Sequence, residues 1–175
     1  DDGFSVFKEM SSEPLALVGE SAGGNLCLTL ILRAFQLGIR LPQAAAFLSP
    51  WCDLSNAGPS VVNNDGRDPA LSAQHIDFAA NYYVGEHDPT NPMISPIYGV
   101  FDKSFPPSII TTGSRDLLMS QAMGLRDVLK DNNVPVELCL WKDLWHVFEW
   151  DYRLPESSES IRQISNWLQR YMPNF

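Results

Sequence analysis

The sequence is poor in cysteine and in positive charge. Only three of its 175 residues are cysteine, Cys27, Cys52 and Cys139, and no C-x-x-C pair occurs. The odd number and wide spacing argue against a disulfide framework, and we interpret the three as small buried side chains in a reducing compartment. The 21 acidic residues outnumber the 12 Lys and Arg, which gives a net charge of −9. Because an acidic surface repels nucleic acid and anionic membranes, neither is an expected partner.

Long apolar runs and histidines are also scarce. No run reaches the roughly 18 residues that a membrane-spanning helix needs, and no segment resembles a signal peptide, so we expect a cytoplasmic protein. The only histidines are His75, His87 and His146. The first two lie near Asp77 and Asp88, but their spacing fits no compact metal-ligand motif. We therefore expect no metal and no cofactor.

What is present indicates one globular domain over residues 1–175. Hydrophobic residues make up 45% of the chain and charged residues 19%, as in ordinary soluble proteins. Short apolar runs alternate with helix-like periodicity, which predicts an α/β fold with a mainly parallel sheet flanked by helices. The first residues, 1–13, are expected to end a helix that packs on the sheet. The expected strands are Leu15–Gly19, Gln43–Leu48, Ser108–Thr112 and Val136–Trp141, and the expected helices are Ala22–Leu37, Ser72–Tyr83, Met119–Lys130 and Ile161–Tyr171.

The segment 19–23 reads G-E-S-A-G and lies between the first strand and the first long helix. This context is typical of a nucleophile elbow, a tight turn that exposes a strained serine, here Ser21, at the end of a strand. Side chains two positions away would collide across the turn, and Gly19 and Gly23 fit that requirement. The backbone N–H of Ala22, at the start of the helix, is the expected donor to a developing oxyanion. An ordinary strand–helix turn is the alternative.

A serine nucleophile needs a base, and a base needs an orienting acid. His146 follows the fourth predicted strand and Asp116 follows the third, so both are expected at the sheet edge where Ser21 emerges. The competing acids Asp143 and Glu149 lie too near His146 in sequence to reach it from a separate strand. Two alternatives remain open: Asp116 as a helix N-cap, and His146 as a satisfied core histidine.

The sequence resembles the hormone-sensitive-lipase-like (bacterial family IV) esterases of the α/β-hydrolase superfamily. Glu20 departs mildly from that family, which usually places Asp before the serine. The resemblance implies a serine-dependent carboxylic-ester hydrolase that works through a Ser-His-Asp triad and an acyl-enzyme. It rests on five motifs in order: GESAGGNL at 19–26, LSPWCDL at 48–54, NPMISP at 91–96, GSRDLL at 113–118 and WHVF at 145–148.

The family also carries a His-Gly-Gly oxyanion motif ahead of the nucleophile strand, and none occurs in this sequence. The resemblance therefore implies the C-terminal part of a longer enzyme, which alone should turn substrate over poorly. We expect the missing N-terminal half to be present as another segment or chain, because the nucleophile strand would otherwise be an exposed edge. The resemblance also implies a homodimer through Val136–Trp141 or Ile161–Tyr171.

Residues 51–98 are rich in Asn, Asp, Gly and Pro, and the resemblance implies that they form a cap over the substrate. The alternative is an ordinary surface loop without a functional role. Trp51, Phe78, Tyr82 and Tyr83 are candidate pocket residues, which favours short- to medium-chain or aryl esters; core packing is equally open. The same machinery cleaves amides and carbamates. A non-catalytic small-ligand-binding protein and an inactive half-enzyme are the other functional hypotheses.

Overall fold

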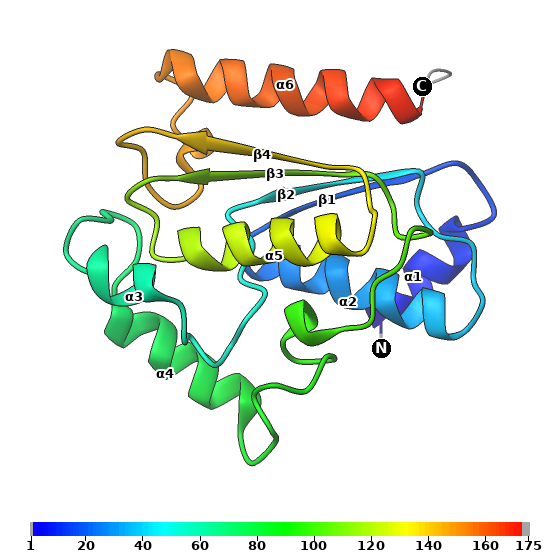
Figure 1. Cartoon of the computed structure of the whole chain (residues 1–175), viewed down its shortest axis with the longest axis horizontal. Coiled ribbons are helices and arrows are strands. Elements are labelled where there is room, and N and C mark those ends of the chain that lie inside the picture. Colours follow the sequence, from blue (N-terminus) through cyan, green and yellow to red (C-terminus); the bar gives the residue numbers. More distant parts are fainter. Residues whose placement is uncertain (1, 173–175) are drawn as a thin grey trace.

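The computed structural model describes residues 2–172, and its centre is a four-stranded parallel sheet with strand order β1-β2-β3-β4 (Figure 1). This architecture confirms the predicted α/β class. Each strand lies within one residue of its predicted bounds, because short runs of strand-forming residues bounded by turns mark them in the sequence. The strands are β1 Ala16–Glu20, β2 Ala44–Leu48, β3 Ser108–Gly113 and β4 Val136–Trp141.

Helices cover both faces of the sheet. In Figure 1, α2 and α5 lie below the strands, α6 lies above them, and α3 and α4 lie farther from the sheet. Two expectations need correction: α6 begins at Pro155, where proline suits a first helical position, rather than at Ile161, and α1 packs against α2 rather than on the sheet. The helices are α1 Asp2–Met10, α2 Ala22–Gln36, α3 Pro59–Asn63, α4 Ala73–Val84, α5 Met119–Asp131 and α6 Pro155–Tyr171, with short 3-10 turns η1 Pro96–Tyr98 and η2 Phe148–Trp150.

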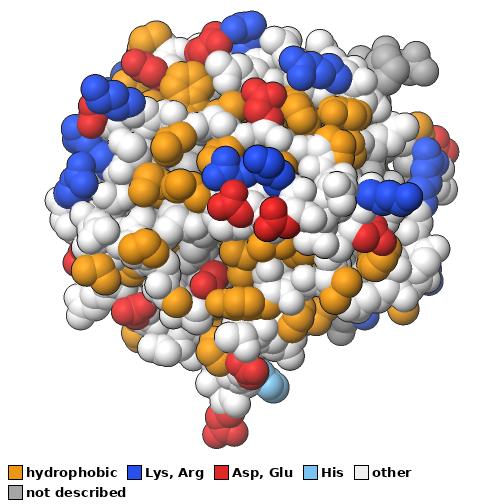
Figure 2. Space-filling model, in the orientation of Figure 1, with side chains coloured by type: hydrophobic (Ala, Val, Ile, Leu, Met, Phe, Trp, Pro, Cys, Tyr) orange, Lys and Arg blue, Asp and Glu red, His pale blue; other side chains and the backbone are white. Residues whose placement is uncertain are grey.

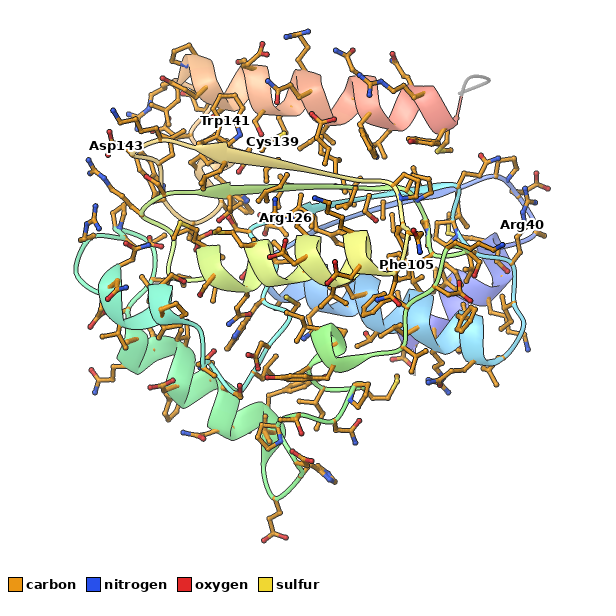
Figure 3. All side chains as sticks on the ribbon, in the orientation of Figure 1. Arg40, Phe105, Arg126, Cys139, Trp141 and Asp143 are labelled. Atoms are coloured by element: carbon orange, nitrogen blue, oxygen red, sulfur yellow. The ribbon has the colours of Figure 1, made fainter. Side chains whose placement is uncertain are left out.

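Alternation along the central strands divides the core into two layers. On β2, Ala45 and Phe47 face the layer formed with α2 and α5, whereas Ala46 and Leu48 face α6. Strand β2 is buried along its whole length, as expected for a parallel strand covered on both sides. Figure 3 shows Cys139 on the α6 side of β4, where burial raises the pKa of its thiol to about 11.

The two edges of the sheet differ in exposure from its centre. Within the described residues β1 pairs only with β2, and Val18 on β1 is 56% exposed. Strand β4 forms the other edge, where Leu140 is 48% exposed.

In the part of the chain that the structure describes, no helix has the length and apolar character needed to cross a bilayer. The homodimer expected through β4 or α6 stays a prediction.

The surface seen in Figure 2 carries acidic and basic side chains interspersed with hydrophobic ones, rather than one large field of a single sign. On the face in this view, charges of both signs stand close together and partly offset each other.

Replacement of Phe47 by Ala tests the core. The Phe47 side chain is fully buried between β2 and the α2–α5 layer, so Phe47→Ala should lower the free energy of unfolding by about 3–5 kcal/mol. Val62→Ala, at a position 78% exposed, is the control and should change it by less than about 0.5 kcal/mol. Denaturant unfolding measures both, and equal effects would contradict this account of the core.

Candidate active site

Strand register brings the candidate residues to one edge of the sheet. Glu20 lies beside Leu48, Leu48 beside Thr111, and Gly113 beside Trp141, so all four strands end together. The chain segments that follow these ends contain Ser21, Ser49, Asp116 and His146. In open α/β sheets this carboxyl edge is where ligands bind.

Ser21 sits in a strained turn between β1 and α2. Its φ of 48° and ψ of −120° are unfavourable for a residue with a side chain. Within the described residues its hydroxyl caps no N–H of α2. Oγ is therefore not engaged in capping the helix. Two main-chain bonds fix the turn: Ser21 N donates to Leu48 O at 2.9 Å, and Trp51 N donates to Ser21 O at 3.0 Å.

Of the two glycines that were expected to avoid a collision across the turn, only Gly19 does so. A Cβ on Gly19 would collide with the carbonyl of Gly23 and would lie 2.8 Å from Cys27 Sγ, so glycine is required there. A Cβ on Gly23 would meet nothing within 4 Å, which corrects the expectation that position 23 must also be small. Gly24, which the sequence reasoning did not single out, is the tighter neighbour, because its Cβ would lie 3.0 Å from Pro50 Cβ.

Asp116 and His146 form a buried pair. His146 Nδ1 lies 3.1 Å from Asp116 Oδ1, and the two side chains are 7% and 0% exposed. Asp116 Oδ2 accepts from Thr112 Oγ1 at 2.9 Å, and Oδ1 accepts from Leu118 N at 2.8 Å. The N-cap of α5 is Leu118, so Asp116 is not the cap of that helix. With Nδ1 on the carboxylate, Nε2 is the ring nitrogen left for other chemistry.

Competing forces set the pKa of Asp116. Burial raises the pKa, but the hydrogen bond and charge of His146 lower it, helped by bonds from the Ser49 hydroxyl and the Leu118 N–H. The net result is a pKa below the ordinary value for Asp, so the carboxylate stays ionised beside the imidazole. An ionised, hydrogen-bonded acid can hold one imidazole tautomer and stabilise the imidazolium.

Both competing acids are engaged elsewhere. Asp143, in the loop after β4 (Figure 3), pairs with Arg115 at 3.4 Å, and both side chains are about half exposed. Glu149 Oε1 accepts from Thr111 Oγ1 at 2.7 Å and from Ser160 Oγ at 2.8 Å, which places it toward α6. Burial raises the pKa of Glu149.

Ser49 connects the elements of the site, although the sequence analysis gave it no role of its own. It is fully buried at a φ of 46°, and its N donates to Thr111 O at 2.7 Å. Its Oγ accepts from Val147 N at 3.1 Å, next to His146. Ser21 itself bonds to Leu48, so residues 48 and 49 join the serine turn to the histidine loop. In the described residues no hydrogen bond joins Ser21 Oγ to the His146 ring.

Two cavities open beside Ser21. A cavity of about 290 Å³ is lined by Ser21, Trp51, His75 and neighbouring apolar residues. A larger one of about 700 Å³ contains all four predicted pocket aromatics. Three of these, Phe78, Tyr82 and Tyr83, are 66% to 87% exposed on α4, which argues against core packing for them. The larger cavity is lined by Ala22, Asn25, Leu26, Thr29, Trp51, Leu54, His75, Phe78, Ala79, Tyr82 and Tyr83.

Ser72, where the helix was expected to begin, is the N-cap of α4, because its Oγ accepts from His75 N at 3.3 Å. The cap sets where α4 begins and so where its aromatic side chains stand over the cavity. Asn25 ties the same region to α2, with Nδ2 donating to Trp51 O at 3.0 Å and to Ile94 O at 2.8 Å. No group of three or more metal-ligating side chains occurs among residues 2–172.

Comparison with known proteins identifies the family. Residues 5–150 match the family described as having the alpha/beta hydrolase fold. A mutant of the esterase E40 superposes with a TM-score of 0.91 over 97% of this chain and 59% of that one, at 29% identity. An esterase from the bacterial hormone-sensitive lipase family superposes with a TM-score of 0.85 over 89% of this chain and 52% of that one, at 31% identity.

The chain belongs to the hormone-sensitive-lipase-like branch of the α/β-hydrolase family. Among curated proteins it is 30% identical over 156 residues to an acetyl-hydrolase of Streptomyces hygroscopicus, across 89% of this chain and 52% of that protein. It is 26% identical to an esterase of Acinetobacter venetianus, across 87% of this chain and 51% of that one. The chain thus spans about half the length of these relatives.

The elbow of this hydrolase fold gives a matched pair of variants. Gly19→Ala should lower the melting temperature by several degrees, because the added methyl meets the Gly23 carbonyl. Gly23→Ala adds the same methyl into open space and should leave the melting temperature within about two degrees. Thermal unfolding measures both, and equal losses would contradict the assignment of the crowded position.

The buried acid predicts a pH dependence of stability. A carboxyl whose pKa is lower in the folded state stabilises the fold above its unfolded-state pKa of about 3.9, and this is lost as pH falls through the folded-state pKa. Between about pH 4 and pH 2, the unfolding free energy of the wild type should therefore fall more steeply than that of Asp116→Asn. Asp65→Asn, at an exposed position, should follow the wild-type slope, and parallel curves for all three would refute the linkage.

Proposed function

We propose that this chain carries the catalytic triad of a carboxylic-ester hydrolase, with Ser21 as nucleophile, His146 as base and Asp116 as orienting acid. The observation that carries the proposal is the buried 3.1 Å contact between Asp116 and His146, at the sheet edge where the strained Ser21 turn also lies. A serine hydroxyl at neutral pH needs such a pair to lose its proton. The names of the relatives, acetyl-hydrolase and esterase, support the same reaction.

Acylation follows from these roles. Ser21 Oγ attacks the ester carbonyl carbon while its proton passes to His146 Nε2, and Asp116 stabilises the imidazolium that forms. The tetrahedral intermediate carries its charge on the former carbonyl oxygen. The N–H of Ala22, the first residue of α2, supports this oxyanion together with the positive end of the helix. Collapse expels the alkoxide, which leaves as the alcohol with the proton from His146.

Deacylation repeats the sequence with water. His146 Nε2 takes a proton from water, the hydroxide attacks the acyl carbon, and the Ser21–acyl bond breaks. The proton returns to Ser21 Oγ and the carboxylic acid leaves. Neither acylation nor deacylation requires a cofactor. Amide and carbamate bonds fit the same chemistry, with a poorer leaving group as the difference.

The cavities support uncharged ester substrates of modest size. The smaller cavity, of about 290 Å³, suits a short acyl group beside Ser21, and the larger, aromatic-rich cavity suits a medium-length or aryl group. We propose that residues 51–98 act as the cap, because α4 supplies Phe78, Tyr82 and Tyr83 to the larger cavity. The low polarity of these walls favours neutral groups over charged ones.

We also propose that β1 accepts a further strand from a segment or second chain that carries additional oxyanion donors. Support comes from the exposed edge: within the described residues β1 pairs only with β2, and Val18 is 56% exposed. An unpaired apolar parallel edge favours association. Loss of one oxyanion donor typically costs about a hundred- to a thousandfold in turnover, so this partner would raise the activity strongly.

Turnover of p-nitrophenyl butyrate tests the triad. Ser21→Ala and His146→Ala should each lower kcat by at least about a thousandfold, because the proton-transfer unit fails when either member is missing. His87→Ala is the matched control, since His87 is an exposed histidine in the same protein, and it should leave kcat within twofold. Undiminished turnover by His146→Ala would mean that the activity does not depend on this histidine.

A further inference from the structure

Two buried polar side chains in the 51–98 segment bond to the main chain of the loops that carry Asp116 and His146. Asn64 is 2% exposed and Asp68 is 6% exposed, although both lie in a turn rich in polar residues. The sequence reasoning gave neither of them a role. Buried polar groups are costly unless hydrogen-bonded, so their partners show what the burial achieves.

Asp68 bridges three separate segments with one carboxylate. Its Oδ2 accepts from Leu117 N at 3.1 Å and from His146 N at 3.3 Å. Its Oδ1 accepts from Ala70 N at 2.8 Å and from Leu71 N at 3.2 Å. All four donors are main-chain N–H groups, so this one side chain joins the backbones of all three segments.

Asn64 holds the other side of the acid loop. Its Nδ2 donates to Asp116 O at 2.8 Å and to Ser114 O at 3.2 Å. Its main-chain O accepts from Asp68 N at 3.2 Å, and Arg67 donates to its Oδ1 at 3.2 Å. Residues 64–68 therefore form one hydrogen-bonded turn. This turn bonds the main chain on both sides of the Asp116 side chain.

We propose that Asp68, supported by Asn64, is a positioning residue that sets the distance and angle between Asp116 and His146. The 3.1 Å contact of that pair joins two loops that follow different strands, β3 and β4. The Asp68 carboxylate bonds both loops at once, at the residue after Asp116 and at His146 itself. That this pair drives catalysis rests on the proposed function; that Asp68 holds it does not.

The same carboxylate also reaches the wall of the smaller cavity. Ala70 and Leu71, whose N–H groups bond Asp68 Oδ1, line that cavity together with Ser21. Asp68 therefore links the wall beside the serine to the backbone of the base. Misplacement of catalytic groups by about 1 Å can cost a hundredfold in rate, so a link of this kind has kinetic consequences.

The first test reads the histidine directly, without any requirement for activity. The Nδ1–H proton of His146, hydrogen-bonded to Asp116, is followed by NMR in protein labelled with ¹⁵N-histidine and assigned with His146→Ala. Asp68→Ala should broaden or abolish this resonance through faster exchange with water. Asp68→Asn retains one acceptor oxygen and should give an intermediate result. An unchanged resonance in the folded Asp68→Ala protein overturns the proposal.

Two controls separate positioning from loss of stability. Asp88→Ala removes an exposed carboxylate that bonds only Thr90 in its own turn among the described residues, and should leave the resonance unchanged. Phe47→Ala serves as a destabilised reference and should also keep it. Should Asp68→Ala not fold, Asn64→Ala releases the acid loop while Asp68 remains, and the same broadening is expected. Broadening in the destabilised reference as well would overturn the proposal.

The second test reads the rate at which a fluorophosphonate labels Ser21. Asp68→Ala should slow labelling by up to about a hundredfold in the wild-type background but have no effect in a His146→Ala background, because Asp68 acts through that histidine. Equal slowing in both backgrounds overturns the proposal. A wild type that fails to label while the resonance still responds to Asp68→Ala removes the proposed function and leaves the positioning role supported.

Discussion

The parallel pairing of four strands in register is the constraint on which the rest of this structure depends. Because the strands end together, the segments after β1, β2, β3 and β4 emerge at one edge, and residues far apart in sequence become neighbours. Full burial of β2 fixes that register, since a slip of one residue would turn Phe47 out of its layer. The site is therefore a consequence of the core packing as well as of the motifs.

At that edge the protein concentrates both backbone strain and buried polarity. Ser21, Ser49 and Val147 have φ values of 48°, 46° and 47°, conformations that are uncommon for residues with side chains. Hydrogen bonds from neighbouring turns hold them: Ser49 Oγ bonds Val147 N, and Leu48 O bonds Ser21 N. The buried carboxylate of Asp116 stays ionised because hydroxyl, N–H and imidazole donors outweigh the cost of its desolvation.

The sequence was enough to predict the strands, the positions of Ser21, Asp116 and His146 after three of them, and the aromatic face of α4. These features depend on local periodicity and on turns. It did not reveal Ser49, Asn64 or Asp68, since the bonds that tie them to the acid and histidine loops reach main-chain groups 49 or more positions away. A single polar residue in a loop has no local signature of burial. The expectation that position 23 must be small was also wrong, because a Cβ on Gly23 would meet nothing within 4 Å, whereas a Cβ on Gly24 would lie 3.0 Å from Pro50 Cβ.

The most direct test of this account is a crystal structure of the protein after reaction with a fluorophosphonate. We predict phosphonyl density on Ser21 Oγ, with one phosphonyl oxygen within hydrogen-bond distance of Ala22 N and with His146 Nε2 facing the adduct while Nδ1 remains on Asp116. Density on another residue, or an imidazole turned away from an adduct on Ser21, would contradict the proposed roles of these residues.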